Sequence, residues 1–149
     1  MIGDRQALDT HVKAWQESDT TDEPLGFILS MEGADPIAWP EQVHAWYEDG
    51  LRAISLSHYG ISAYAYGTGT EGGLTNKGPA LLKEMEKAGI VLDLTHLADI
   101  AFWEALDCFS GPVIASHNNC RALVPHQRQF TDDQLKAIIE RNGVVGAAL

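Results

Sequence analysis

The 149-residue chain is poor in basic residues and in cysteine. Its 10 Lys and Arg stand against 21 Asp and Glu, which gives a formal net charge of −11 at pH 7. Nonspecific binding to nucleic acid or to an anionic membrane needs clustered positive charge, so neither is expected. The two cysteines, Cys108 and Cys120, are too few for a disulfide framework. Cys108 lies in an apolar helical stretch, and we expect it to be a small residue of the core.

Long apolar runs and a targeting signal are missing from the sequence as well. No apolar stretch approaches the roughly 20 residues that a membrane-spanning helix needs. Residues 1–6 lack the basic and apolar regions of a secretion signal, which favours a cytoplasmic location. With 45% hydrophobic and 21% charged residues, the composition is typical of one globular domain.

Four apolar runs have the length and the aliphatic content of buried strands. They cover residues 26–32, 51–58, 89–96 and 112–117, and they end in Glu32, His58, His96 and His117. The carboxyl ends of parallel strands meet at one face of an α/β fold, where their side chains share a site. One carboxylate and three imidazoles at such positions provide most of the ligands of a zinc site.

Helical patterns separate these runs along the chain. An amphipathic pattern covers residues 5–17, before the first run. The other helices are expected to begin near Asp35-Pro36, Gly78-Pro79, Asp99 and the capping-box sequence Thr131-Asp132-Asp133-Gln134, and residues 144–149 have the pattern of a fifth strand. Strands and helices that alternate in this way predict right-handed parallel βα units.

The predicted fold is α/β, a partial (β/α)8 TIM-type barrel with about five parallel strands. Five strands are too few to close an eight-stranded barrel. A doubly wound sheet is the alternative, but such folds usually carry a glycine-rich phosphate-binding turn after the first strand. Residues 32–36, Glu-Gly-Ala-Asp-Pro, are not such a turn. The glycine-rich segment of this chain is residues 59–77, a long loop of the kind that is usually functional.

The strand-end residues suit the coordination chemistry of zinc. Zinc prefers imidazole nitrogen and carboxylate oxygen, and a catalytic zinc keeps one position for water. Glu32 could bridge two metal ions through its two oxygens. His96 and His117 could complete the ligand set of one ion, and His58 is placed to contact a substrate oxygen. Each residue also has an ordinary interpretation, as a satisfied histidine or as an exposed loop carboxylate.

Short motifs contain these residues in a fixed order. They are Met31-Glu32-Gly33, Leu56-Ser57-His58, Gly73-Leu74-Thr75-Asn76-Lys77-Gly78, Asp93-Leu94-Thr95-His96 and Pro112-Val113-Ile114-Ala115-Ser116-His117. In this order and spacing the chain resembles the zinc dipeptidase family of renal (membrane) dipeptidase. The resemblance extends from about Phe27 to Leu149. Each motif alone is weak, and the ordered set is specific.

The resemblance implies a (β/α)8 barrel that uses two zinc ions to hydrolyse dipeptides, often with a D-residue at the C-terminal position. It implies that Glu32 bridges the two ions and that His96 and His117 complete the ligands of the second. His58 would polarise the scissile carbonyl or stabilise the oxyanion. Arg128 would hold the substrate carboxylate, a role that suits the bidentate guanidinium. Arg121 is the competing candidate for this role by position.

The chain also departs from the pattern of that family. The family has a His-x-Asp pair on its first strand and an aspartate on its last strand, and neither has a counterpart in this sequence. The chain therefore resembles the third through seventh strands of the barrel, a single segment preceded by the helix at about residues 5–17. We expect at most one zinc ion and little activity from this chain alone. Its open strand edges predict self-association into a homo-oligomer.

Two other functions are consistent with the same residues. One is a noncatalytic metal-binding or self-assembling module, which the missing ligands favour. The other is a different metal-dependent hydrolase of the barrel type. Such hydrolases usually begin with His-x-His on the first strand and use a lysine as the bridging ligand, whereas the bridging residue here is Glu32.

Overall fold

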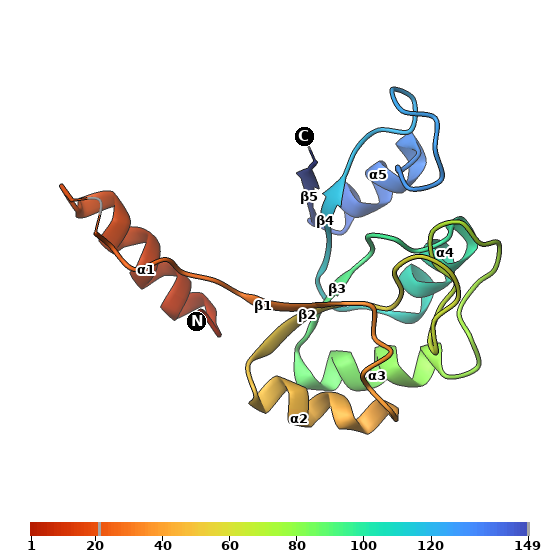
Figure 1. Ribbon diagram of the computed structural model, residues 1–149, viewed down its shortest axis with the longest axis horizontal. Helices are drawn as coiled ribbons and strands as arrows, with labels where there is room; N and C mark the ends of the chain where they lie inside the picture. The colour runs from red at the N-terminus through yellow and green to blue at the C-terminus, as the bar shows by residue number, and fades with distance from the viewer. Residues whose placement is uncertain (21, 149) are drawn as a thin grey trace.

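The sheet has five parallel strands that follow one another in space in the same order as in the sequence. The computed structural model describes residues 1–20 and 22–148. The strands are β1 (Leu29–Glu32), β2 (Leu51–Ser55), β3 (Val91–Asp93), β4 (Val113–Asn118) and β5 (Val144–Ala147), in the order β1-β2-β3-β4-β5 (Figure 1). Each neighbouring pair is parallel. This arrangement is the curved wall of an incomplete barrel, so the predicted fold class is confirmed.

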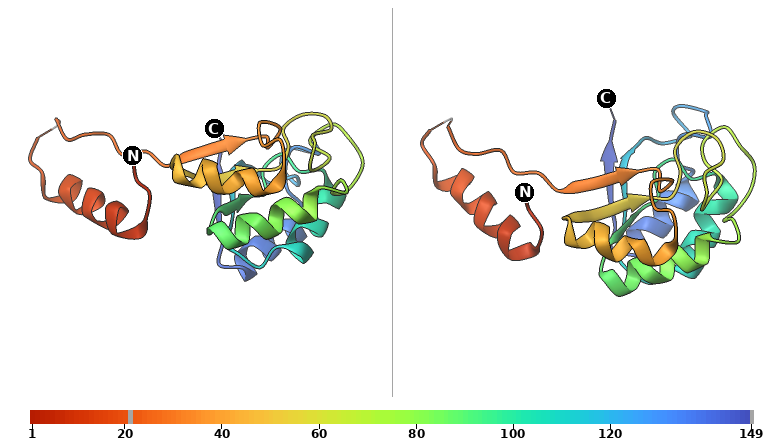
Figure 2. Two further views of the ribbon diagram at one scale, coloured as in Figure 1. Left: turned by 90° about the horizontal axis from the view of Figure 1, so that it is seen from below. Right: turned by 60° about the horizontal axis from the view of Figure 1, so that its bottom comes forward.

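Helices cover one face of this sheet, as the views in Figure 2 show. They are α2 (Val43–Glu48), which follows the 3-10 helix η1 (Pro40–Gln42), α3 (Gly78–Ala88), α4 (Asp99–Cys108) and α5 (Asp132–Glu140). Gly89 ends α3 with a φ of +76°, a left-handed conformation that glycine adopts without strain. Thr131 and Gln134 form the expected capping box at the start of α5.

The core lies between the sheet and these helices. Ile54 pairs with Leu92, and Leu92 pairs with Val113, so the three side chains share one face of the sheet. They are at most 2% exposed and belong to one apolar cluster with residues of α3 and α4, among them Leu82 and Phe102. Burial of these residues fixes the register of the strands, because a slip by one residue would turn them to the opposite face.

The opposite face of the sheet is open at its edges. Val144 in β5 is 66% exposed, and Phe27 and Ile28, just before β1, are 56% and 51% exposed. The prediction that residues 26–29 lie in a buried strand is therefore wrong, because β1 has a neighbour on one side only. A groove of about 320 Å³ lies between the sheet residues Ala53 and Ile114 and the N-terminal residues of the chain.

Two local expectations are also wrong. Asp35 does not cap a helix, since its carboxylate accepts a hydrogen bond from the backbone N–H of Ala63 at 2.7 Å, and the helical turn begins only at Pro40. Cys108 is exposed at the end of α4 rather than in the core. Its position is the last of the helix, just before the segment that leads into β4.

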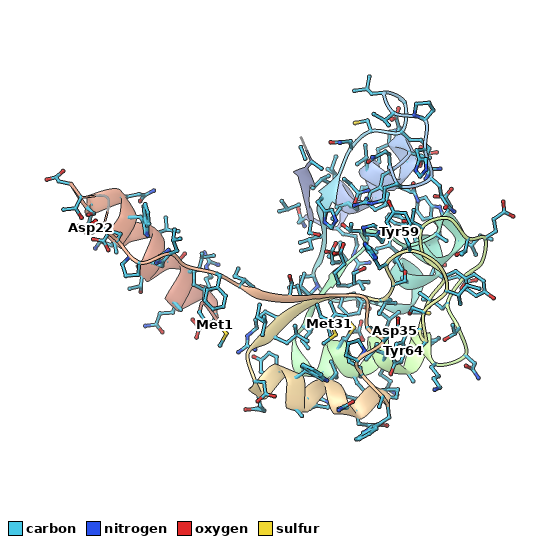
Figure 3. All side chains as sticks on the ribbon, in the orientation of Figure 1. Met1, Asp22, Met31, Asp35, Tyr59 and Tyr64 are labelled. Carbon is cyan, nitrogen blue, oxygen red and sulfur yellow. The ribbon has the colours of Figure 1, made fainter. Side chains whose placement is uncertain are left out.

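A separate N-terminal arm, residues 1–20 and 22–28, precedes the α/β body of residues 29–148. It contains α1 (Arg5–Glu17), which has no buried residue and stands away from the sheet in Figure 1. In Figure 3, Asp22 lies at the far end of the arm and Met1 at the end near the body. The arm touches the body through Arg52, whose Nε donates to the carbonyl of Gly3 at 2.6 Å. Among the described helices none is long and apolar enough to cross a membrane.

Candidate metal centre

Glu32, His96 and His117 come together at the carboxyl ends of the strands. Glu32 is the last residue of β1, His96 follows β3, and His117 lies near the end of β4. Glu32 Oε1 lies 3.1 Å from His96 Nε2 and 3.1 Å from His117 Nε2. Within residues 1–20 and 22–148, this is the one group of three His, Cys, Asp or Glu side chains whose donor atoms could hold a metal ion.

His58 lies beside this group, with Nε2 4.0 Å from Glu32 Oε1 and its ring centroid 4.3 Å from that of His96. It is half exposed, so it faces the opening of the site. Tyr59 lies next to it, with its ring edge-on to His96 at a centroid distance of 5.2 Å (labelled in Figure 3). Sequence reasoning missed Tyr59, although its place directly after a strand-end histidine was a usable signal.

His96 is held in an unusual backbone conformation. Its φ is +70°, which costs a non-glycine residue about 1–3 kcal/mol unless its surroundings impose it. Thr68 supplies such a restraint, because its hydroxyl donates to the backbone carbonyl of His96 at 3.2 Å. The side chain of His96 is 4% exposed. Burial, together with the positive charges of Arg128 and the neighbouring histidines, lowers the pKa of His96 to about 4, so its imidazole is neutral at pH 7.

His117 is supported by the side chains of Ser116 and Asp93. The hydroxyl of Ser116 lies 2.8 Å from His117 Nδ1 and donates a hydrogen bond to Asp93 Oδ2. Asp93 Oδ1 in turn accepts the backbone N–H groups of Thr95 and Ser116, each at 3.0 Å. Sequence reasoning did not identify Asp93, Ser116 or Thr68 as part of the site. Ser116 carried a signal, a hydroxyl residue directly before His117, whereas Asp93 and Thr68 had no signal of this kind.

Of the two candidate arginines, the structure brings Arg128 to the histidines. Arg128 Nη2 donates to the carbonyl of His117 at 2.7 Å, while its Nη1 is buried without a hydrogen-bond partner among residues 1–20 and 22–148. Burial lowers the pKa of Arg128, and the nearby Tyr59, Glu32 and Asp93 oppose that shift. Arg121 instead makes a bidentate ion pair with Asp99, at 2.8 and 2.6 Å. Through this ion pair Arg121 holds the loop after β4 against α4.

The glycine-rich loop, residues 59–77, links the strand ends to one another. Its Thr68 N–H donates to the carbonyl of His58 at 3.0 Å, next to Gly67. A Cβ atom at Gly67 would lie 2.2 Å from that carbonyl oxygen, so only glycine allows the close approach. Gln127, from the loop after β4, accepts from Gly69 N at 2.6 Å and donates to the carbonyl of Thr70 at 2.7 Å. These contacts explain why this long loop is ordered.

The three donor groups fit a metal ion of the zinc type. Two imidazole nitrogens and one carboxylate oxygen are preferred ligands of zinc. Ligand atoms about 2.0–2.2 Å from a tetrahedral ion stand about 3.4 Å apart, close to the 3.1 Å that separates Glu32 Oε1 from each Nε2 atom. Three protein ligands leave the fourth position open, which is the arrangement of catalytic rather than structural sites.

Comparisons with known proteins point to one family. The chain is 36% identical over 134 residues to an uncharacterised protein of Acinetobacter calcoaceticus from a PQQ-III 3′ region, covering 84% of this chain and 42% of that protein. It is 32% identical over 130 residues to dipeptidase aclJ of Aspergillus oryzae, covering 84% of this chain and 31% of the relative. The chain thus spans less than half the length of these relatives.

A solved structure and a family profile agree with these relatives. A metallopeptidase from Rhodobacter sphaeroides, liganded with a phosphinate mimic of the dipeptide L-Ala-D-Ala, superimposes with a TM-score of 0.73 at 32% identity. The match covers 80% of this chain and 37% of that structure, which shows that the strands form part of the barrel found there. The sequence profile of the membrane dipeptidase family matches residues 5–149. The chain therefore belongs to the membrane dipeptidase family, peptidase family M19.

Proposed function

We propose that these residues form part of the active site of a zinc dipeptidase, in which Glu32, His96 and His117 hold the metal. The observation that carries the proposal is the meeting of one carboxylate oxygen with two imidazole nitrogens at 3.1 Å each. These donors come from three different strand ends, where an α/β barrel places its catalytic groups. Zinc, when bound there, supplies Lewis acidity and lowers the pKa of water from about 15.7 toward about 7.

His58 is proposed as a catalytic residue that contacts the substrate. Its Nε2 lies 4.0 Å from Glu32 Oε1, and half of the side chain is exposed. A hydrogen bond from this imidazole to the scissile carbonyl oxygen would polarise the carbonyl and stabilise the negative charge that develops on it. No metal ligand is displaced by such a contact, because His58 lies outside the group of three close donors.

Arg128 is proposed to bind the carboxylate of a dipeptide. Its Nη1 is buried and has no hydrogen-bond partner in the described part of the chain, and a buried donor without a partner is costly. A substrate carboxylate would supply the missing acceptor and a compensating negative charge. The dipeptide mimic bound by the Rhodobacter sphaeroides relative supports this substrate class.

A second candidate is a metal-binding module that self-associates. The exposed edge residues Ile28 and Val144 favour it, since unpaired strand edges promote pairing with another chain. This candidate predicts metal binding and a homo-oligomer without hydrolysis. The dipeptidase proposal predicts that the same three ligands are needed for both metal binding and hydrolysis.

Zinc titration by calorimetry tests the proposed ligands. Glu32→Gln and His117→Ala are each expected to weaken zinc binding by at least about 100-fold, since loss of an outer partner alone costs about 10–100-fold. His11→Ala, in the N-terminal arm, is the matched control and should bind zinc as the wild type does. Dipeptide hydrolysis, measured for the same variants in the gene product that carries this sequence, should fall in parallel. Hydrolysis that survives Glu32→Gln would reject the proposal.

A further inference from the structure

Two hydroxyl groups each lie against the Nδ1 atom of a histidine proposed to bind metal. Ser116 Oγ is 2.8 Å from His117 Nδ1, and Thr68 Oγ1 is 3.1 Å from His96 Nδ1. Both histidines point the opposite nitrogen, Nε2, at Glu32. A hydroxyl can donate or accept, so the partner of its single proton decides which ring nitrogen carries hydrogen.

The Ser116 hydroxyl uses its single proton in a hydrogen bond to Asp93. Ser116 Oγ donates to Asp93 Oδ2, and an ionised carboxylate can only accept. Two backbone N–H groups, at 3.0 Å from Asp93 Oδ1, hold the carboxylate in place. Having no second proton, Ser116 Oγ must accept from His117, which places hydrogen on His117 Nδ1.

The Thr68 hydroxyl likewise uses its single proton in a hydrogen bond, in this case to a backbone carbonyl. Thr68 Oγ1 donates to the backbone carbonyl of His96, an acceptor without a proton, at 3.2 Å. The hydroxyl must therefore accept from His96 Nδ1. Thr68 is 2% exposed, so water has little access to compete for this contact. Two residues from unrelated parts of the chain, the glycine-rich loop and β4, thus impose the same arrangement.

We propose that Thr68 and Ser116 are positioning residues that hold His96 and His117 in the Nδ1–H tautomer. In this tautomer both Nε2 lone pairs face Glu32 Oε1. Each Nε2 atom lies 3.1 Å from Glu32 Oε1, and acceptor atoms this close repel one another unless a cation lies among them. The two hydroxyls therefore prepare the site for a metal ion before it arrives, in the way that outer partners of ligating histidines usually do. This inference rests on the proposed ligand set, but its tautomer statement does not require metal.

Nitrogen-15 NMR of the histidine side chains tests the tautomers directly, in the metal-free chain at a pH where the imidazoles are neutral. The wild type should show hydrogen on Nδ1 of His96 and of His117. Hydrogen on Nε2 of either ring would overturn the inference for that residue, whatever any variant does. If the wild type shows the Nδ1–H tautomers and binds no zinc, the proposed function fails while the inference stands.

Matched variants test the effect on metal affinity. Ser116→Ala and Thr68→Val should each weaken zinc binding by about 10–100-fold. Ser116→Thr and Thr68→Ser, which keep the hydroxyl, should restore binding to within a few fold of the wild type. Ser110→Ala, away from the site, is the control. If Ser116→Ala and Thr68→Val keep both the wild-type zinc affinity and the Nδ1–H signals, the two hydroxyls do not position the histidines.

Discussion

The N-terminal arm and the α/β body both contain amphipathic helices, but only the body buries their apolar faces. In α1, Leu8, Val12 and Trp15 are 38%, 42% and 41% exposed. In α3, by contrast, Leu82 and Met85 are 0% exposed. The same spacing of apolar residues thus predicts a helix in both regions, while the presence of a sheet face decides whether the helix is packed.

The difference has a consequence for stability. A helix of 13 residues is marginal in water without tertiary packing. Local contacts support α1, among them the cap of Asp4 on Ala7 N and an exposed ion pair between Arg5 and Asp9, and each contributes about 1 kcal/mol or less. The body instead removes a continuous apolar cluster from water. We therefore expect the body to determine the cooperative unfolding of the chain.

The largest effect is expected from Phe102→Ala in the body. Phe102 is fully buried in α4 and packs edge-on against Phe130 at a ring-centroid distance of 5.1 Å. Truncation leaves a cavity, and the free energy of unfolding should fall by about 3–5 kcal/mol. Urea denaturation followed by circular dichroism measures the change. Phe27→Ala, a 56% exposed position in the arm, is the matched control, and an equal loss in both variants would contradict the comparison.

An intermediate effect is expected from the ion pair between Arg121 and Asp99. The hydrogen bonds from Arg121 lower the pKa of the Asp99 carboxyl below its ordinary value of 3.8. A carboxyl whose pKa is lowered by folding stabilises the fold fully when the pH is above its ordinary, unfolded-state pKa. That contribution is lost as the pH falls through the lower pKa of the folded state. Because Asp99 is 44% exposed, solvent limits the contribution to about 1 kcal/mol.

Urea denaturation of Arg121→Met and the wild type at pH 6 and at pH 3 measures this contribution. The difference in unfolding free energy between them should shrink at pH 3 without vanishing, because Arg121 also donates to the carbonyls of Gln127 and Gln129. A difference that grows as the pH falls would show that the ion pair does not stabilise the loop after β4.

Much of the fold follows from local sequence patterns. Local signals correctly predict the beginning of α3 at Gly78, the beginning of α5 at Asp132, the end of β1 at Glu32 and the presence of the fifth strand. These signals are caps, glycines and aliphatic runs, which act over a few residues. Asp35 shows the limit of such reasoning. Its sequence context is that of a helix cap, but its carboxylate instead accepts a hydrogen bond from the backbone N–H of Ala63, 28 positions later in the chain.

The candidate site was predictable in its strand-end residues and not in their supports. Glu32, His96 and His117 each follow or end a strand, and they lie close together because the carboxyl ends of parallel strands meet at one face of the fold. Thr68 reaches His96 from 28 positions earlier in the chain, through a loop whose path depends on the glycine at position 67. Arg128 and Arg121 are indistinguishable by residue type, and their tertiary contacts, with His117 and with Asp99, separate them. The roles of the site residues stay predictions until zinc binding is measured.

The smallest effect on global stability is expected from Trp15→Ala in the arm. Trp15 Nε1 donates to the carbonyl of Pro24 at 2.9 Å, a contact made entirely within the arm. Its removal should change the free energy of unfolding of the body by less than about 0.5 kcal/mol. The same change should loosen α1, so that trypsin cleaves after Lys13 several times faster. Trp15→Phe keeps an aromatic ring but loses the N–H donor, and cleavage as fast as in Trp15→Ala would assign the effect to the hydrogen bond. A loss above about 1 kcal/mol in the free energy of unfolding would mean instead that α1 packs on the body in solution, because a residue that supports only the arm cannot lower the stability of the sheet.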